Sequence, residues 1–507
     1  MLEIKEYKPK GTEKAINILQ KAINTPNKKF LVYYDPDIDG LVAGYLAEEL
    51  LKLLGKDEEV EYIINENRTH GFLIEDLEKY KDYFILAVDF GITREEIKKI
   101  VDSGIDIVSI DHHEIEDELI EYENQGYQGI VINNQYPFEP EAQRFLSGGG
   151  MVYYFMRAVL GKMTRQLDYE SLAGISLLSD VRVTESLEAR AFLERTFNNN
   201  SAFFQYLINL TKGEYLSSEK AQRYSGFGKL DRMYRNYVDF IFSPKFNALF
   251  RLNKGEDAIE LLKINPDIVK KYMTNFELDK VKDKQNKIRD LIIEHLTGQE
   301  YSNLNVKGLT SNFSIEGDFK LSNFIGVACS KIKDNYKTTL VYKESKENYI
   351  ERGSVRGLYD EVDYLSIFQS EGFNAAGHKG AFGVLDTDLS NINWESLNAK
   401  IKKAEEEVSK NLQALKKIVK INNLSTYMNN ETYKKIPEYN SFVRSQNRIY
   451  LKYTGNNYTK RLLGKLILYT VDNIKVKCFD EDITMENGYI LPMIEKGGYI
   501  EYTLNRI

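Results

Sequence analysis

Three apolar runs in the first part of the chain each end on acidic residues, and this pattern restricts the possible folds more than any other feature. The runs are "KFLVYY", "YFILAV" and "DIVSI", and charged segments with helical spacing separate them. Strands that alternate with helices predict an α/β unit with a mainly parallel sheet. In such a sheet ligands bind beyond the carboxyl ends of the strands. Asp35, Asp89 and Asp111, which follow the three runs, should therefore meet at one site.

The stretch "DPDIDG" places Asp35, Asp37 and Asp39 at alternating positions. Burying three carboxylates without a partner would be costly, so a cation is expected among them. The stretch resembles the opening of an EF-hand calcium loop. However, the twelfth position of that loop must be a bidentate Glu and is Leu46 here, and a strand rather than a helix precedes it. We therefore favour a metal site that draws ligands from several strand ends.

Adjacent histidines strengthen the prediction of a metal site. The chain has five histidines, and His112 and His113 directly follow Asp111. The segment "LLSDVR" adds Asp180. Carboxylates mixed with imidazole suit Mn²⁺ or Mg²⁺. Two such ions ~3.5–4 Å apart can activate water and bind both the attacking and the leaving oxygen of a phosphoryl centre. The sequence thus predicts a dinuclear site for phosphoryl chemistry.

The rest of the chain divides into regions of different pattern. Mostly helical segments are followed by a second strand–helix region with the glycine-rich stretch "GFNAAGHKGAFGV". The last segments alternate apolar and polar residues with period two, which is typical of antiparallel strands. We expect five parts: an α/β domain (1–195), a helical connector (196–300), a second α/β domain (301–390), a linking helix (391–425) and a small β module (426–507).

Composition and charge exclude several classes of protein. Hydrophobic residues make up 42% and charged residues 28% of the chain, as in soluble globular proteins, and no apolar stretch is long enough for a membrane span. The charged first residues lack a signal-peptide pattern. Cys329 and Cys478 are too few for a disulfide framework or a thiolate zinc cluster. A net charge of −8 argues against a general polyanion binder. We expect a cytoplasmic protein without a membrane partner.

Six ordered motifs resemble those of a known family. "DPDIDG", "AVDFGI", "SIDHHE" and "LLSDV" resemble the motifs of the DHH phosphoesterase superfamily, and "GSVRG" and "GHKGAFG" resemble the substrate-binding motifs of its associated domain. The resemblance covers roughly residues 28–390. "ENRTHGF", "KFNALFRLNKGEDAIELLK" and "NFIGVACSKIKDNY" are most similar to the RecJ family of single-stranded-DNA exonucleases. The resemblance implies a DHH domain with a mainly parallel sheet, a helical connector, a DHH-associated α/β domain and a C-terminal β module like an oligonucleotide-binding fold.

The resemblance also implies roles for individual residues. Asp89 would bridge two metal ions, His113 would face the substrate or complete a metal shell, and Asp111 would orient the histidines. The implied metal ligands are Asp35, Asp37, Asp39, Asp89, His112 and Asp180. For Asp35 the resemblance leaves two roles open, a direct metal ligand or a residue of the outer shell. The implied catalytic residues are Asp89, His112, His113 and His378, and the implied substrate-binding residues are Arg68, Arg251, Ser354, Arg356, Gly377 and His378. Among the last group, Arg68, Ser354 and Arg356 would hold a 5′-terminal phosphate.

These expectations combine into one functional prediction with two alternatives. We expect a metal-dependent 5′→3′ exonuclease that uses two divalent cations, Mn²⁺ in preference to Mg²⁺, to release 5′-mononucleotides from single-stranded DNA in repair, recombination or replication. A single-strand-binding protein or a helicase would be candidate partners. The first alternative is a phosphodiesterase of short oligonucleotides or cyclic dinucleotides. The second is a non-catalytic replication scaffold, which the intact set of metal-binding motifs disfavours.

Overall fold

The computed structural model divides into two compact units. The first comprises Met1–Leu358 and Leu365–Asn393, and the second comprises Tyr359–Tyr364 and Trp394–Ile507. The structure describes residues 3–64, 77–140, 143–180, 187–199, 201–217, 238–274, 277–333, 337–359, 362–415, 417–422, 424, 449–463, 466–478, 483–495 and 499–505.

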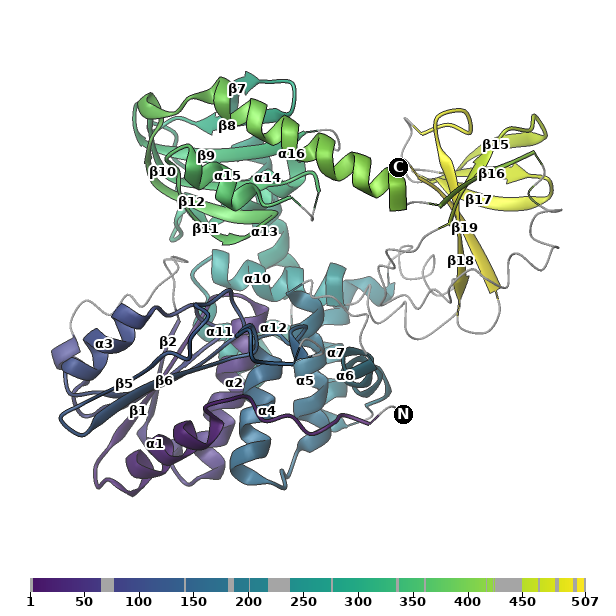
Figure 1. The fold of residues 1–507 in the computed structure, drawn as a ribbon. Helices are drawn as coiled ribbons and strands as arrows, with labels where there is room; N and C mark the ends of the chain where they lie inside the picture. Colours follow the sequence, from purple (N-terminus) through teal and green to yellow (C-terminus); the bar gives the residue numbers. More distant parts are fainter. Residues whose placement is uncertain are drawn as a thin grey trace. The chain divides into compact units, whose positions relative to one another are not determined.

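A six-stranded, mainly parallel sheet forms the base of the first unit, which confirms the predicted fold class. Its strand order is β2-β1-β3-β4-β6-β5, in which only β5 pairs antiparallel, at the edge beside β6 (Figure 1). The strands β3 and β4 are buried along their whole length, as expected for parallel strands with helices on both faces. The strands are β1 (Lys29–Tyr34), β2 (Val60–Ile64), β3 (Tyr83–Val88), β4 (Asp106–Asp111), β5 (Glu121–Asn124) and β6 (Tyr127–Asn133).

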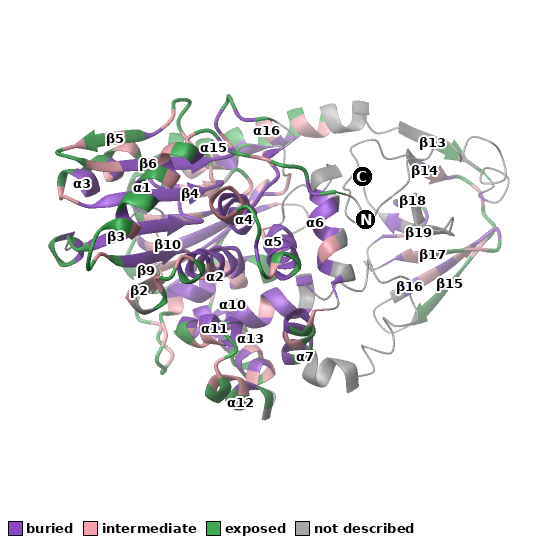
Figure 2. Cartoon of the chain, turned by 90° about the horizontal axis from the view of Figure 1, so that it is seen from below, coloured by how far each residue is buried: buried purple, intermediate pink, exposed green. Residues whose placement is uncertain are grey.

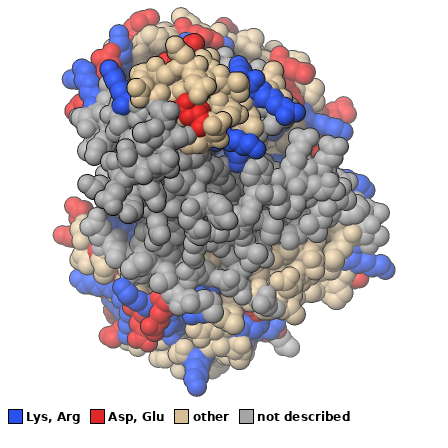
Figure 3. Space-filling model, turned by 90° about the vertical axis from the view of Figure 1, so that its right-hand side faces the viewer, with Lys and Arg blue, Asp and Glu red and all other residues tan. Residues whose placement is uncertain are grey.

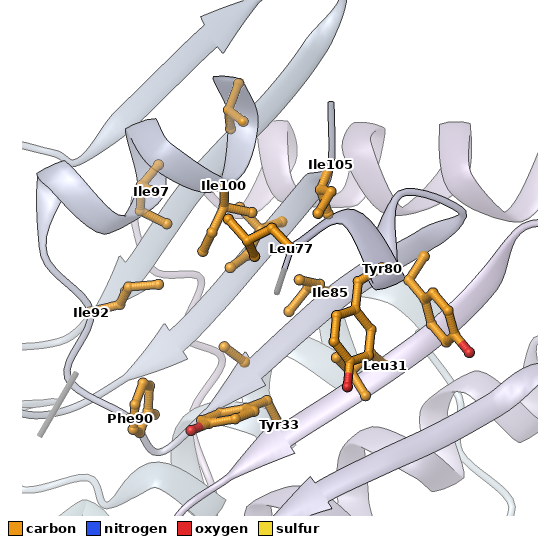
Figure 4. Packing of buried hydrophobic residues seen from close by; sticks show 14 of the residues in the cluster. Leu31, Tyr33, Leu77, Tyr80, Ile85, Phe90, Ile92, Ile97, Ile100 and Ile105 are labelled. Carbon is orange, nitrogen blue, oxygen red and sulfur yellow. The ribbon is translucent and has the colours of Figure 1, made fainter. Parts of the chain in front are cut away.

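Different helices pack on the two faces of this sheet. Gly44 of α2 lies against the ring of Tyr34, whereas Gly129 of β6 lies against Ile97 of α3 on the other face. Figure 4 shows Ile97 and Ile100 of α3 above the side chains of the strands, and Figure 2 shows α2 and α4 as largely buried. The helices are α1 (Thr12–Asn24), α2 (Ile38–Leu53), α3 (Arg94–Asp102), α4 (Gly148–Leu160) and α5 (Gln166–Ser179), with the short turns η1 (Asp57–Glu59) and η2 (Leu77–Tyr80).

A helical segment leads from this sheet to a second one. Its elements are α6 (Leu187–Asn198), α7 (Ala202–Ser217), the π-helical turn η4 (Val238–Phe242), α10 (Ser243–Arg251), α11 (Gly255–Leu262), α12 (Pro266–Thr274) and α13 (Glu277–Glu294). The helix α13 packs against α10 and against α14 of the following region. None of the helices in the described ranges combines the length and the apolar character that crossing a bilayer requires.

The second sheet of the first unit is mostly antiparallel. Its order is β11-β12-β10-β9-β8-β7, and only β8 and β9 pair in parallel. The elements are β7 (Thr297–Glu300), β8 (Leu304–Leu309), η5 (Leu321–Phe324), α14 (Ile325–Ile332), β9 (Thr338–Lys346), β10 (Tyr349–Arg356), α15 (Tyr364–Ser370), β11 (Asn374–His378), β12 (Ala381–Asp388) and η6 (Leu389–Asn391).

The second unit joins a long helix to a seven-stranded sheet. The sheet order is β13-β14-β18-β19-β17-β16-β15, and Leu451, Val476 and Ile490 belong to its buried core. Asp472 and Asn473 have φ values of 49° and 67°, which suits the tight hairpin turn between β16 and β17. The elements are α16 (Trp394–Leu415), β13 (Lys417–Ile421), β14 (Ile449–Tyr453), β15 (Tyr458–Leu463), β16 (Leu466–Val471), β17 (Ile474–Cys478), β18 (Tyr489–Glu495) and β19 (Tyr499–Asn505).

Charged side chains of both signs occur together on the surface. On the face drawn in Figure 3, Lys and Arg side chains lie among Asp and Glu side chains over the described residues. This mixture agrees with the modest net charge of −8. An extended basic surface, as expected of a general polyanion binder, is not visible among the coloured atoms of that face.

Candidate active site

A cavity of about 320 Å³ lies in the first unit, at the carboxyl ends of β1, β3 and β4. One side of it, here called the acidic wall, consists of Asp35, Asp37, Asp39, Asp89, His112, His113 and Asp180. The other side, here called the arginine–serine wall, comes from η5, α14 and β10 to β12, and its polar members include Ser322, Asn323, Ser330, Arg352, Ser354 and Arg356. Arg251 of α10 and Gly377 of β11 also line the cavity. The structure thus brings together most of the residues that the sequence predicted.

The start of α2 positions the first two carboxylates. Asp37 is the N-cap residue, and its Oδ1 accepts a hydrogen bond of 3.1 Å from the amide of Gly40. Asp39 lies in the first turn, where a carboxylate interacts favourably with the helix dipole. A side chain at Gly40 would collide with the backbone of Asp35 at 2.2 Å. The glycine of "DPDIDG" is therefore a steric requirement of this turn.

Asp39 is held in place by the start of another helix. Its Oδ2 accepts a hydrogen bond of 2.9 Å from the amide of Gly148, and its Oδ1 accepts one of 2.8 Å from Gly149 and one from the hydroxyl of Ser176. Burial of the carboxylate, which is 3% exposed, raises the pKa of Asp39 to about 7, and the charges of Asp180 and Asp37 add to this. The hydrogen bonds from Ser176 and Gly149 act in the opposite direction.

Gly148, Gly149 and Ser176 were not among the predicted site residues. Their contribution is to support a ligand rather than to supply one. A side chain at Gly148 would lie 2.5 Å from Cβ of Asp89, and one at Gly149 would lie 2.5 Å from Oγ of Ser176. The available signal was the run "SGGGM" at the start of an apolar helix, because such a run lets backbone amides approach an anion closely.

Asp89 combines strain with unfavourable electrostatics. It directly follows β3 with φ 55°, in the left-handed region that L-residues rarely adopt. Asp89 is 3% exposed, and this burial is the main reason that its pKa lies well above the ordinary value. The negative charges of Asp39 and Asp37 raise the pKa further. Within the described part of the chain, the buried Oδ1 of Asp89 accepts no hydrogen bond, since Nε2 of His112, 2.9 Å away, lacks hydrogen-bonding geometry. Backbone strain and an unsatisfied oxygen in one residue indicate a functional position.

His112 lies in the middle of the acidic wall. Its Nε2 is 2.9 Å from Oδ1 of Asp89 and 3.5 Å from Oδ2 of Asp39, and its Nδ1 is 3.6 Å from Oδ2 of Asp180. The imidazole is 1% exposed. Its two ring nitrogens therefore face carboxylates that come from three different segments of the chain.

Asp111 and His113 form a pair at the end of β4. Nδ1 of His113 lies 2.7 Å from Oδ1 of Asp111. Burial lowers the pKa of His113, but the charge and the hydrogen bond of Asp111 outweigh it and raise the pKa to about 9. Burial likewise raises the pKa of Asp111, but the charge and the hydrogen bond of His113 bring it below the ordinary value. Without a bound cation, Asp111 thus favours the charged form of His113 at the side of the cavity. Asp111 contacts His113, as the orienting role predicted for it requires.

The arginine–serine wall presents hydrogen-bond donors. Nη1 of Arg356 donates to Oγ of Ser354 at 2.8 Å, and Nε donates to Oγ of Ser330 at 3.2 Å. Ser354 is 6% exposed. Arg352 also lines the cavity and was not predicted. A guanidinium between hydroxyl groups is suited to bind a phosphate or carboxylate.

Two predicted residues lie beyond what the structure describes. Arg68 belongs to residues 65–76, which are outside the described residues. The backbone of His378 ends β11, next to Gly377 with φ 137°, but its side chain is outside the described residues. The roles of Arg68 and His378 remain predictions.

The donor atoms fit hard divalent cations. Ligand atoms of two groups lie within 4.8 Å of one another, Asp89 with Asp111, His112 and His113, and Asp39 with His112 and Asp180. These atoms are carboxylate oxygens and imidazole nitrogens, which suit Mn²⁺ or Mg²⁺. The two cysteines are buried and do not line the cavity. The buried Oδ1 of Asp89, which accepts no hydrogen bond within the described ranges, is an atom that a cation would satisfy.

Comparison with known proteins agrees with this geometry. Residues 29–178 match the DHH family, N-terminal domain, and the chain therefore contains a DHH-family domain. YorK of Bacillus subtilis (strain 168), a prophage-derived protein named as a candidate single-strand DNA-specific exonuclease, is 26% identical over 393 residues. The yorK protein of Bacillus phage SPbeta matches to the same extent. Each match covers 71% of this chain and 62% of the relative, so the chain spans less than two thirds of these relatives.

Solved structures share the fold. RecJ from Thermus thermophilus in complex with Mn²⁺ matches with a TM-score of 0.65 and 17% identity, over 100% of this chain and 72% of that chain. An exonuclease RecJ bound to manganese matches with a TM-score of 0.55 and 20% identity, over 79% of this chain and 95% of that chain. The fold is therefore RecJ-like, which confirms the family resemblance that the sequence motifs indicated.

Proposed function

We propose that this chain, whose DHH-family domain lies in a RecJ-like fold, is a metal-dependent hydrolase that degrades single-stranded DNA from its 5′ end. One observation carries the proposal. A buried carboxylate–imidazole cluster and a set of guanidinium and hydroxyl donors line opposite sides of the same cavity. The first suits cations and the second suits phosphate, so a phosphodiester is a ligand that fits both. Such an activity would serve DNA repair, recombination or replication.

The acidic wall would hold divalent cations. Asp37, Asp39, Asp89, His112 and Asp180 are the proposed ligands, with Asp35 beside them. When bound, such ions polarise a phosphoryl oxygen and lower the pKa of water so that it can attack phosphorus. In 5′→3′ degradation, the bond to O3′ of the terminal nucleotide breaks and a 5′-mononucleotide leaves. His113 would hold a proton at the side of the cavity, and Asp111 would keep its ring in position.

The arginine–serine wall would set the polarity. Ser354 and Arg356 would bind the 5′-terminal phosphate, together with Arg68. The Arg356 guanidinium is fixed by Ser330 and Ser354 before substrate arrives, so less side-chain entropy is lost on binding. A pre-oriented guanidinium of this kind suits a phosphate group.

Labelled oligonucleotides test the proposal. Single-stranded DNA with a 5′ phosphate is labelled at either end in separate reactions with Mn²⁺ or Mg²⁺, beside the Asp89→Ala protein. We expect release of the 5′ label as a mononucleotide, and no release by the variant. Release of the 3′ label first would contradict the polarity. Hydrolysis of dinucleotides but not of long strands would instead support a phosphodiesterase of short substrates. Strand binding without hydrolysis of either would support a scaffold.

A further inference from the structure

A second cavity, here called the isoleucine pocket, adjoins the active-site cavity. Its volume is about 410 Å³, within the range of sites that bind small molecules. The segments that follow β3 and β4 form one side of it, and β11 contributes to the other. His113 and Gly377 line both cavities, so the two meet at these residues. The side chains that give the pocket its chemical character are Ile92, Ile115, Ile120, Asp111, Glu114 and Glu116.

The apolar part of the pocket borders open space. Ile92 and Ile120 are buried members of a hydrophobic cluster, and the partly buried Ile115 packs against the same cluster. Beyond its chain neighbours, a Cβ at Gly91 would have a single described atom within 4 Å, the Cβ of His113 at 3.9 Å. A flat, largely apolar group can therefore lie in the pocket with the isoleucine side chains on one side of it.

The charged groups of the pocket disfavour a phosphate. Asp111, Glu114 and Glu116 line it, whereas no Lys or Arg is among the described residues that do so. The imidazole of His113 is paired with Asp111. A neutral group with hydrogen-bond donors fits such a lining better than an anion does. The base is the neutral part of a nucleotide, and its amino groups can donate to carboxylates.

The pocket borders both walls of the active-site cavity. His113 belongs to the acidic wall. Gly377 of β11 pairs with Phe382 of β12, which in turn pairs with Val355, the residue before Arg356. Under the proposed function, the 5′ phosphate of the terminal nucleotide lies at the arginine–serine wall and the scissile phosphate lies at the acidic wall. The base between these two phosphates needs a third place, and the isoleucine pocket lies next to both.

We propose that the isoleucine pocket binds the base of the 5′-terminal nucleotide, both before cleavage and in the released mononucleotide. This inference rests on the proposed function and extends it, because it assigns a site to the part of the nucleotide that neither wall binds. Contact with the isoleucine side chains depends on the apolar face that every base has. The pocket therefore accepts each of the bases of DNA.

Ligands with and without a base test the pocket in the absence of turnover. Deoxyadenosine 5′-monophosphate and deoxyribose 5-phosphate share a sugar and a phosphate, and only the first has a base. Their affinities are measured by calorimetry with Mn²⁺ present. Ile115→Ala removes part of the apolar lining, and Gly91→Leu places a side chain in the open space. Ile63→Ala is the matched control, because Ile63 is also partly buried against the same cluster but does not line the pocket.

The parent should bind the nucleotide roughly tenfold more tightly than deoxyribose 5-phosphate, since burying part of the base removes apolar surface from water. Ile115→Ala should weaken nucleotide binding about threefold, and Gly91→Leu should abolish most of the difference between the ligands. Ile63→Ala should change neither affinity, and all variants should bind deoxyribose 5-phosphate as the parent does. Thermal melts verify that each protein folds. A parent that does not prefer the nucleotide, or equal losses in Ile115→Ala and Ile63→Ala, would overturn the pocket.

The pocket and the proposed function can fail separately. A protein that shows the expected binding pattern but hydrolyses no single-stranded DNA would refute the proposed function and leave the pocket intact. A protein that degrades single-stranded DNA from its 5′ end but binds both ligands equally would refute the pocket and leave the proposed function intact.

Discussion

The two walls of the cavity differ in how they handle charge. The acidic wall buries Asp39, Asp89 and His112 almost completely, and this burial, followed by the like charges there, raises the pKa values of Asp39 and Asp89. The arginine–serine wall places the guanidinium of Arg356 among hydroxyl partners. The first wall is electrostatically unfavourable by itself, and a bound cation would relieve it. On the second, the Arg356 guanidinium is satisfied by Ser330 and Ser354 and can exchange these partners for phosphate oxygens.

Substitutions on the two walls should therefore have different consequences. Removing a carboxylate from the acidic wall should lower activity but relieve repulsion in the metal-free protein, because strained active sites reduce stability. Removing a donor from the arginine–serine wall should weaken substrate binding and leave the metal-free stability nearly unchanged.

The largest effect is expected for Asp89→Asn. The variant should lose about 10³-fold in kcat, since several kcal/mol of transition-state stabilisation depend on the cations. Its melting temperature in EDTA should rise, because a neutral amide replaces a buried carboxylate whose pKa is raised. Kinetics with Mn²⁺ and thermal melts in EDTA measure both. A lower melting temperature than that of the parent would show that Asp89 is structurally required, against the contrast drawn between the walls.

Gly148→Ala should give the next largest effect. The new methyl group would lie 2.5 Å from Cβ of Asp89, so the carboxylate or the start of α4 must move. A displacement of about 1 Å in a catalytic site can cost 10²-fold in rate, and we expect a loss of that order in kcat. Gly150→Ala is the matched control, because its nearest neighbour is the flexible Leu146 side chain at 3.2 Å. Comparable kcat values for the two variants would contradict the packing argument.

These glycines mark the limit of what the sequence could predict. Apolar runs that end on acidic residues predicted the parallel sheet. Because the carboxyl ends of parallel strands share one edge, they also predicted that Asp35, Asp89 and Asp111 lie close together. The amides that hold Asp39 belong to Gly148 and Gly149, more than a hundred residues away. A backbone donor has no side chain to signal its role, and only the packing of α4 against α2 reveals it. Arg352 was missed for a related reason, since an arginine in a strand can face either side.

A smaller effect is expected on the second wall, from Arg356→Lys. Lysine keeps the charge but cannot offer the planar pair of donors that binds a terminal phosphate. We expect KM for a 5′-phosphorylated strand to rise about tenfold, consistent with the loss of one charge-assisted hydrogen bond. The same strand with a 5′ hydroxyl should show a much smaller change. A fall in kcat with unchanged KM would place Arg356 in the chemical step instead.

The smallest expected effect is a change in the stability of the metal-free protein with pH. It tests the difference between the walls most directly, because it depends on the buried carboxylates of the acidic wall. The pKa of Asp39 is raised to about 7 from an ordinary value of 3.8, so between these values the folded protein binds more protons than the unfolded chain. The free energy of unfolding must then fall as pH rises from about 4 to 7. In EDTA the melting temperature should be higher at pH 5.5 than at pH 7.5, and Mn²⁺ should raise it more at pH 7.5, where the carboxylate is charged. Asp39→Asn should weaken this dependence, whereas Arg356→Lys should preserve it. A melting temperature in EDTA that increases from pH 5.5 to 7.5 would mean that the acidic wall is not the strained side of the cavity.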